Sequence, residues 1–280
     1  MYLSDYLVVV RGGGDLGTGV AHRLVRSGFT VLVTELAQPL AVRRAVSFAE
    51  AVYSGQVTVE GVTARLADDA MLGLAFTVLG EVPVIVDVAD DVLARMRPAI
   101  VVDARLAKRN LGTRREDAQL VVGLGPGFTA GQDCHVVVET NRGPNLGRVY
   151  WTGSAEPDTG QPEPVQGKAG QRVLRAPAEG EFQGYRAIGD LVQPGEVLAS
   201  VGGQPIAAPF AGVLRGMLHD GVPVTAGMKV GDVDPRGLRE YCFLISDKAR
   251  SIGGGVLEAA LAGMDLWRSE ADAEVRTNEE

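Results

Sequence analysis

The chain has 280 residues, of which 46% are hydrophobic and 22% charged, with a formal net charge of −8. This composition predicts a soluble globular protein that is long enough for two domains. The negative charge, with no cluster of Lys and Arg to offset it, argues against a nucleic-acid-binding surface. Two cysteines, Cys134 and Cys242, are too few for a disulfide framework or a Cys-rich metal site. Because no basic leader and no apolar run of about 20 residues is found, we expect a cytoplasmic protein with no membrane contact.

The first half of the chain alternates short β-branched runs with helical patterns. Runs of Val and Ile separated by helices are typical of a parallel sheet covered on both faces. We therefore expect an α/β domain with a mostly parallel, Rossmann-like sheet over residues 1–150. The segment 52–66 breaks the rhythm and predicts a small hairpin or an irregular insert. The expected strands are 6–11, 29–35, 82–87, 99–104 and 118–125, and the expected helices are 15–27, 68–80 and 90–96.

A glycine-rich turn follows the first predicted strand, in the sequence RGGGDLGTG. Gly12, Gly14 and Gly17 match the pattern G-x-G-x-x-G at the start of a predicted helix. Glu35 ends the next predicted strand, where an acid can bond a ribose hydroxyl. Glycines let backbone N–H groups approach a pyrophosphate, and a helix N-terminus adds partial positive charge. The turn therefore predicts a dinucleotide site.

Two interpretations of this turn stay open. In the first, the N–H groups from Gly13 to Gly17 hold a ligand pyrophosphate. In the second, the glycines only allow a strand to pack closely on a helix, and the turn binds nothing. Asp15 bears on this choice, because an acid in the loop opposes an incoming anion unless it caps the helix.

Further polar residues follow the later strands of the predicted sheet. Asp103 and Lys108 come after one strand, Gly127 lies in the turn after the next, and Glu139 and Arg142 follow a third. Open α/β sheets bind ligands at the carboxyl ends of their strands. These residues therefore predict an anion-lined crevice opposite the glycine-rich turn, with ordinary solvated loop charges as the alternative.

Patterns of catalytic chemistry are missing from the sequence. The histidines at 22, 135 and 219 have no metal-ligand spacing. Cys134 and His135 are adjacent, and neighbours on a strand point to opposite faces, so they do not predict a nucleophilic pair. The sequence therefore identifies no catalytic residue and leaves open whether any reaction is catalysed, and we predict no metal site.

The second half contains an internal repeat. A Pro- and Gly-rich stretch over 151–170 predicts a linker. Beyond it, residues 176–201 match residues 208–233 at an offset of 32. Strands this short cannot bury a face alone, so we expect the two copies to interlock into one small β-barrel. Gly189 and Gly221 are expected to occupy equivalent turns.

The repeat resembles the biotinyl/lipoyl-like barrel-sandwich (hammerhead) domain, here over residues 171–246. That fold carries its modified lysine on a hairpin between the two halves. The corresponding segment 200–209 has no lysine, and Lys229 lies elsewhere in the repeat. We therefore expect no biotin or lipoate, and a structural or docking role for this domain.

The C-terminal segment carries three further expectations. Residues 241–246 predict a strand, and residues 247–268 predict a helical segment in which the chain leads through the glycines 253–255 into the helix. Those glycines form either an anion nest at the helix start or a flexible turn. Residues 269–280 predict a disordered acidic tail.

Six stretches, in this order, resemble the accessory-protein family of selenium-dependent molybdenum hydroxylase systems, over residues 6–262. They are VVRGGGDLGTGVAHRL, VDARLAKRN, GLGPGF, ETNRG, APFAGVLRG and GGGVLEA. The first half is similar to xanthine dehydrogenase accessory proteins. The resemblance implies a role in maturing a molybdenum hydroxylase client protein through its pterin cofactor, in the dinucleotide form. It also implies a histidine after ETNRG, where this chain has Pro144.

Two rival functions remain at this point. One is an NAD(P)-dependent oxidoreductase in which Glu35 selects NAD through its ribose. The other is a non-catalytic docking adaptor whose glycines only shape turns. The sequence leaves open the identity of the small-molecule ligand, the client, and whether the chain forms a homo-oligomer.

Overall fold

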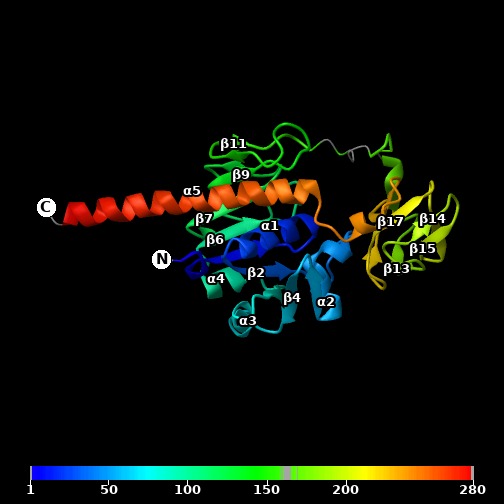
Figure 1. The fold of residues 1–280 in the computed structure, drawn as a ribbon, viewed down its shortest axis with the longest axis horizontal. Helices are drawn as coiled ribbons and strands as arrows, with labels where there is room; N and C mark the ends of the chain where they lie inside the picture. Colours follow the sequence, from blue (N-terminus) through cyan, green and yellow to red (C-terminus); the bar gives the residue numbers. More distant parts are fainter. Residues whose placement is uncertain (1, 159, 161–164, 169, 279–280) are drawn as a thin grey trace.

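The computed structural model describes residues 2–158, 160, 165–168 and 170–278, and only the backbone of residues 265–278. Figure 1 shows a large sheet with helices and, beside it, a smaller all-β unit. We call residues 2–158 together with the C-terminal helix α5 (Asp247–Asn278) the sheet domain, and residues 170–246 the β-domain. The expected combination of a mostly parallel sheet with small antiparallel sheets is confirmed.

The central sheet of the described residues has nine strands, parallel except at its two edges. The antiparallel pairs are the outermost ones. Within the segment 52–66, where a small hairpin was one of two expectations, residues 56–59 and the strand 62–67 form the hairpin that extends one edge, whereas residues 52–54 are helical. Val9 lies in register with Leu32 on one side and Val101 on the other. In spatial order the strands are β10 (Val149–Tyr150), β9 (Val136–Val138), β7 (Leu120–Leu124), β6 (Ile100–Asp103), β1 (Leu7–Arg11), β2 (Thr30–Glu35), β5 (Val82–Val86), β4 (Val62–Ala67) and β3 (Gln56–Val59).

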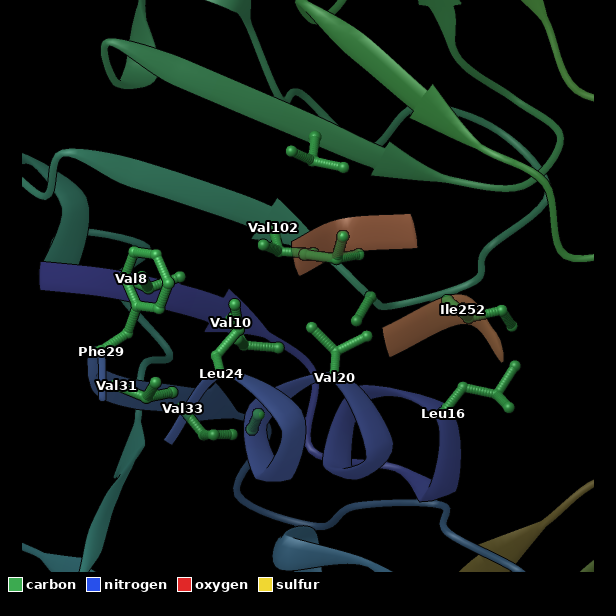
Figure 2. Close-up of a cluster of buried hydrophobic side chains, with 14 of the residues drawn as sticks. Val8, Val10, Leu16, Val20, Leu24, Phe29, Val31, Val33, Val102 and Ile252 are labelled. Carbon is green, nitrogen blue, oxygen red and sulfur yellow. The ribbon is translucent and has the colours of Figure 1, made fainter. Parts of the chain in front are cut away.

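Helices cover both faces of this sheet, as its Val-rich strands predict. On one face, α1 (Asp15–Arg26) presents Leu16, Val20 and Leu24 to alternate strand residues such as Val8 and Val10 (Figure 2). Burying each such side chain contributes about 1.5–3 kcal/mol. The opposite face packs against α3 (Ala70–Thr77) and α4 (Val92–Met96). The other helices are α2 (Ala51–Ser54) and the short 3-10 helices at 3–5, 44–46, 48–50, 115–117, 170–172 and 239–242.

The C-terminal segment differs from expectation in three ways. Residues 241–246 form no strand, because a 3-10 helix (Arg239–Cys242) and a loop precede α5. Helix α5 continues through Asn278, past the expected boundary at 268, so residues 269–278 are helical; residues 279–280 lie outside the described residues. The reason is a helical spacing of buried residues from Ala249 through Ile252 and Val256, continued by Ala-, Glu- and Arg-rich sequence that favours helix.

Helix α5 lies beside α1 and closes the core of the sheet domain (Figure 1). The glycines 253–255 lie inside this helix rather than at its start, so neither of the two expected forms, an anion nest or a flexible turn, is present there. They serve close packing instead: an added Cβ at Gly253 would lie 2.8 Å from the carbonyl oxygen of Gly19 on α1. Within the described part of the chain, no helix, α5 included, is both long and apolar enough to cross a membrane.

The β-domain contains two four-stranded antiparallel sheets around a shared core. Each strand of the first repeat has its counterpart 32 residues later, and each sheet takes strands from both copies. The predicted interlocking of the repeats is thereby confirmed. The two sheets are β12 (Val173–Arg175), β19 (Lys229–Asp234), β17 (Gly212–Met217) and β14 (Leu191–Val192), and β16 (Gln204–Ala207), β15 (Val197–Val201), β13 (Gly180–Gly184) and β18 (Pro223–Val224).

The hydrogen bonds of the two copies match as well. Gly189 has φ +98° and donates to the carbonyl oxygen of Leu214 at 2.8 Å. Gly221 has φ +79° and donates to the carbonyl oxygen of Phe182 at 2.9 Å. Since Leu214 is the repeat counterpart of Phe182, the two glycines occupy equivalent turns, as predicted.

The expected linker starts later than 151. Strand β11 (Gly153–Ser154) pairs with β8 (Thr129–Ala130), and Glu156 donates its N–H to the Glu139 carboxylate at 2.8 Å. These contacts keep the chain on the sheet domain at least that far. Residues 159, 161–164 and 169 of the expected linker lie outside the described residues.

Candidate functional site

The glycine-rich turn joins β1 to α1 through very close backbone contacts. Gly12 has φ +98°, and an added Cβ there would lie 3.1 Å from the carbonyl oxygen of Ala104, just after β6. An added Cβ at Gly17 would lie 2.0 Å from the carbonyl oxygen of Gly12. The first and third glycines of the motif therefore serve the tight turn and the helix–strand packing that dinucleotide-binding turns require.

Gly14 is the open position of the turn. It has φ −60°, and an added Cβ would meet nothing within 4 Å. The N–H of Thr18 donates to the carbonyl oxygen of Gly14 at 2.7 Å in the first turn of α1. Because the first N–H groups of a helix have no acceptor inside it, and carry partial positive charge, this end of α1 can accept an anion.

Glu35 binds the turn directly. Its Oε1 accepts the N–H of Gly13 at 2.6 Å, and its Oε2 accepts the N–H of Leu36 at 2.9 Å. Burial raises the pKa of the Glu35 carboxyl, although both hydrogen bonds oppose that shift. Glu35 was expected to bond a ribose, but its carboxylate is engaged with the protein, and the N–H of Gly13 is thereby taken.

Asp15 faces a cation rather than capping α1. Its Oδ2 lies 3.6 Å from Nη1 of Arg43, and the N-terminus of α1 has no side-chain cap. The acid in the loop is thus partly neutralised by a residue that the sequence did not single out.

The carboxylate of Asp103, at the end of β6, is buried and binds neighbouring side chains of the protein. It is 1% exposed and accepts hydrogen bonds from Nη2 of Arg105 at 2.6 Å and Oγ1 of Thr113 at 2.7 Å. Arg11, at the end of β1, donates to the same Thr113 hydroxyl at 3.0 Å and pairs with Asp90. Burial opposes ionisation of Asp103, but the bonds from Arg105 and Thr113 outweigh it and lower the pKa of this carboxyl.

Glu139 follows β9, as expected, and its carboxylate binds backbone N–H groups of the protein. It is 0% exposed, and its Oε1 accepts the N–H groups of Thr140 at 2.8 Å and Asn141 at 2.7 Å. Such a carboxylate orders the loop after β9 and does not reach a ligand. The sequence could not distinguish this role, because polar residues after a strand suit either one.

The other predicted residues lie in exposed or tightly packed loops. Lys108 is half exposed and pairs with Asp158 at 3.2 Å. Arg142 pairs with Asp247, the first residue of α5, at 2.6 Å. An added Cβ at Gly127 would lie 2.6 Å from the backbone nitrogen of Arg109, so the turn after β7 packs on the loop after β6.

The loops that carry the predicted motifs therefore lie side by side at one edge of the sheet. Most of their contacts are between backbone atoms, and few of the predicted side chains face one another. The turn after β1 packs on Ala104, and the turn after β7 packs on Arg109. Of the predicted crevice, the open part is the N-terminus of α1 beside Asp15. Arg43 adjoins this opening and has Arg215 of β17 as a neighbour. The sequence analysis missed both, because nothing in the sequence links residues 172 positions apart.

A separate groove lies on the face of the sheet that is opposite to α1. It has a volume of about 830 Å³ and is lined by residues including Leu7, Arg11, Asp90, Arg97 and Arg114. Its charges are of both signs, and Arg11 is already paired with Asp90. Within the described residues, no group of three or more His, Cys, Asp or Glu side chains is placed to hold a metal ion.

Comparison with known proteins finds a strong sequence relative. The chain is 50% identical over 255 residues to a protein of Escherichia coli (strain K12) described as the uncharacterized protein YqeB. The match covers 91% of this chain and 47% of the relative, so the chain spans about half the length of the protein it matches. No family model matches the sequence.

Solved structures give only weak similarity. An aspartoacylase family protein from Mesorhizobium loti is 14% identical, with 81% of this chain and 84% of the other covered and a TM-score of 0.25. The ectoine utilization protein EutE (DoeB) from Ruegeria pomeroyi is 14% identical, with 81% and 85% covered and a TM-score of 0.25. Similarity at this level supports no argument about function.

Proposed function

We propose that the chain is a cytoplasmic accessory protein of a selenium-dependent molybdenum hydroxylase system. It binds a molybdenum–pterin dinucleotide, or a related nucleotide, at the turn between β1 and α1 and delivers it to a client hydroxylase. The observation that supports this most is the convergence of the family-like motifs at one edge of the sheet. Gly12 packs beside Ala104 and Gly127 beside Arg109, so three of these stretches, which are far apart in sequence, lie together at the turn that leads into α1.

The fold agrees with this proposal in its finer features. The order of the sheet reverses between β1 and β6, which is the topological switch point where Rossmann-like domains bind dinucleotides. We assign the β-domain to the barrel-sandwich type because its two repeats interlock. The hairpin between β15 and β16 turns at Gly202 and Gly203, so it offers no amine for biotin or lipoate. A docking role suits such a domain.

The turn fits the phosphates of a dinucleotide in part. Gly14 leaves room for an anion at the N-terminus of α1, and phosphate oxygens accept hydrogen bonds from such N–H groups. The N–H of Gly13, in contrast, is already bound by Glu35. The pterin and its metal would then be held by groups outside this turn.

The second candidate, a docking adaptor that binds no nucleotide, is favoured by that same Glu35–Gly13 hydrogen bond. The carboxylate occupies an N–H that a pyrophosphate would use, and packing alone accounts for Gly12 and Gly17. An NAD(P)-dependent oxidoreductase would use the same turn, so the ligand has to be measured.

Gly14→Val tests the proposal without damaging the fold, because φ −60° suits valine and the space is open. We expect the affinity for the bound dinucleotide to fall about tenfold to several hundredfold, since one or two charge-assisted hydrogen bonds are lost. Gly254→Val is the matched control, because it fills open space on α5 away from the turn. Calorimetric titration should be made with the molybdenum–pterin dinucleotide and with NAD, beside thermal melts.

The result separates the three functions. Binding of the pterin dinucleotide that Gly14→Val weakens supports the proposal. Binding of NAD alone favours the oxidoreductase. Absence of binding to either ligand, with no small molecule retained in native mass spectrometry, favours the adaptor.

A further inference from the structure

Two arginines from different domains are buried together at the junction of the sheet domain and the β-domain. Arg43 follows β2 and is 8% exposed, and Arg215 lies on β17 with a side chain 13% exposed. Backbone contacts bring them together. The N–H of Met217 donates to the carbonyl oxygen of Val42 at 2.7 Å, and Nε of Arg44 donates to the carbonyl oxygen of Met217 at 3.1 Å.

Arg215 has no close carboxylate partner among the described residues. The nearest carboxylates are those of Asp232 and Asp234, whose Oδ2 atoms each lie 3.8 Å from a nitrogen of the Arg215 guanidinium. Both acids are bound more closely by other arginines, Asp232 by Arg172 at 2.7 Å and Asp234 by Arg236 at 2.5 Å. Arg215 is therefore a largely buried cation whose neighbouring carboxylates are already engaged.

Arg43 is in a similar position. Its Nη2 donates to the carbonyl oxygens of Tyr241 at 3.2 Å and Leu244 at 3.0 Å, and its closest recorded acid is Asp15 at 3.6 Å. Its Nε, like Nε of Arg215, is buried and has no hydrogen-bond partner within the described residues. Buried N–H donors are nearly always paired, so two orphan donors at one place point to a missing acceptor.

The electrostatics of the cluster support the same conclusion. Desolvation lowers the pKa of the Arg215 guanidinium, and the positive charge of Arg43 lowers it further. Lys229 on β19 has an exposed side, although desolvation by the surrounding protein lowers the pKa of its ammonium, and it interacts electrostatically with Asp15 and Arg215. It therefore lies at the open side of the cluster. Together, five cations (Arg43, Arg172, Arg215, Lys229 and Arg236) share three carboxylates (Asp15, Asp232 and Asp234).

We propose that this junction binds an oxyanion of the phosphate class, a free phosphate or pyrophosphate or a phosphate ester, between Arg43 and Arg215 with Lys229 at the entrance. A guanidinium presents several N–H donors in a plane that matches phosphate oxygens, and it stays charged when desolvated. The site adjoins the proposed nucleotide turn through the Arg43–Asp15 pair. It differs from that turn in its donors, which are side chains of both domains and not the backbone N–H groups of the turn. A ligand bound there contacts the sheet domain and the β-domain at once.

Calorimetric titration of the full chain with inorganic pyrophosphate tests the site. We expect wild type to bind with a dissociation constant below about 1 mM and Arg215→Met to bind at least about tenfold more weakly, as expected for losing a charge-assisted hydrogen bond. Arg186→Met is the matched control, because Arg186 is a half-exposed arginine of the same domain paired with Glu196. Its affinity for pyrophosphate should equal that of wild type.

Thermal melts supply a second measurement. Without pyrophosphate, Arg215→Met should melt at the wild-type temperature or above it, because the substitution removes a poorly paired buried charge. With pyrophosphate at millimolar concentration, the melting temperature of wild type should rise, and that of Arg215→Met should not change. If Arg215→Met does not fold, the exposed Lys229→Met replaces it, with an expected loss of about threefold to tenfold in affinity.

Gly14→Val separates this site from the nucleotide turn. Loss of pyrophosphate binding in Arg215→Met supports the junction site, whatever Gly14→Val does. Loss in Gly14→Val with full binding in Arg215→Met would overturn the junction site while leaving the nucleotide proposal standing. Failure of wild type to bind pyrophosphate would overturn the junction site as well.

Discussion

The chain contains two runs of three consecutive glycines, at 12–14 and 253–255. Their backbone conformations differ. The first is the turn between β1 and α1, and the second lies in the middle of α5. The difference comes from their neighbours. A β-branched strand ends before the first run, whereas apolar residues at helical spacing, such as Ala249, Ile252 and Val256, surround the second. A glycine run therefore indicates where side chains are absent, and the flanking periodicity decides the conformation.

Within each run, one glycine is needed for a specific contact and another faces open space. An added Cβ at Gly255 would lie 2.2 Å from the carbonyl oxygen of Gly147, whereas one at Gly254 would meet nothing within 4 Å. Gly12 has φ +98° and packs on Ala104, whereas Gly14 has an ordinary φ and open surroundings. Each run thus carries its own matched control.

The largest effect is expected at Gly255. Gly255→Ala would force α5 away from the loop that contains Gly147, and we expect it to lower the free energy of unfolding by about 3 kcal/mol, at the upper end for overpacking. Gly254→Ala should raise it by roughly 0.5–1 kcal/mol, because alanine is the better helix former. Urea unfolding of both variants measures this, and equal effects at 254 and 255 would show that α5 does not pack as described.

The first run should show a smaller contrast. Gly12→Ser places a side chain at φ +98° and against Ala104, and we expect a loss of about 2 kcal/mol in unfolding free energy. Gly14→Ser should change it by less than about 0.5 kcal/mol, because serine suits both the open space and the N-cap position. Thermal and urea denaturation check this pair. A large loss in Gly14→Ser would mean that the turn is more tightly packed than its contacts indicate.

The smallest effect concerns Glu35, which binds the N–H of Gly13. Burial raises the pKa of Glu35 above 4.5 in the folded protein, so the ionised carboxylate is less favourable there than in the unfolded chain. As the pH falls from 7 through the folded-state pKa towards 4.5, wild type should gain stability relative to Glu35→Gln, which does not titrate. Denaturation of both proteins across this pH range measures the difference. A difference that shrinks as the pH falls would contradict the raised pKa.

Much of the sheet domain could be predicted because its signals are local. The Val-rich strand of residues 7–11, the helix after it and the close approach at Gly17 all follow from periodicity and from the positions of glycines. The internal repeat predicted the interlocked β-domain, because an offset of 32 residues is visible in the sequence itself. The strand predicted at 241–246 is wrong, because a short apolar run does not by itself distinguish a strand from a 3-10 turn and a loop.

The sequence by itself determined which segments form strands and helices in the sheet domain, where the repeat lies, and which turn can expose its backbone, because each depends on residues a few positions apart. Only the tertiary structure decided that α5 returns to cover the first sheet and that Glu35 binds Gly13. It also decided that the carboxylates of Asp103 and Glu139 are buried and hydrogen-bonded within the protein. It also decided that Arg43 and Arg215 meet. These outcomes depend on contacts between residues that are distant in the chain, and on which partner each buried charge finds there.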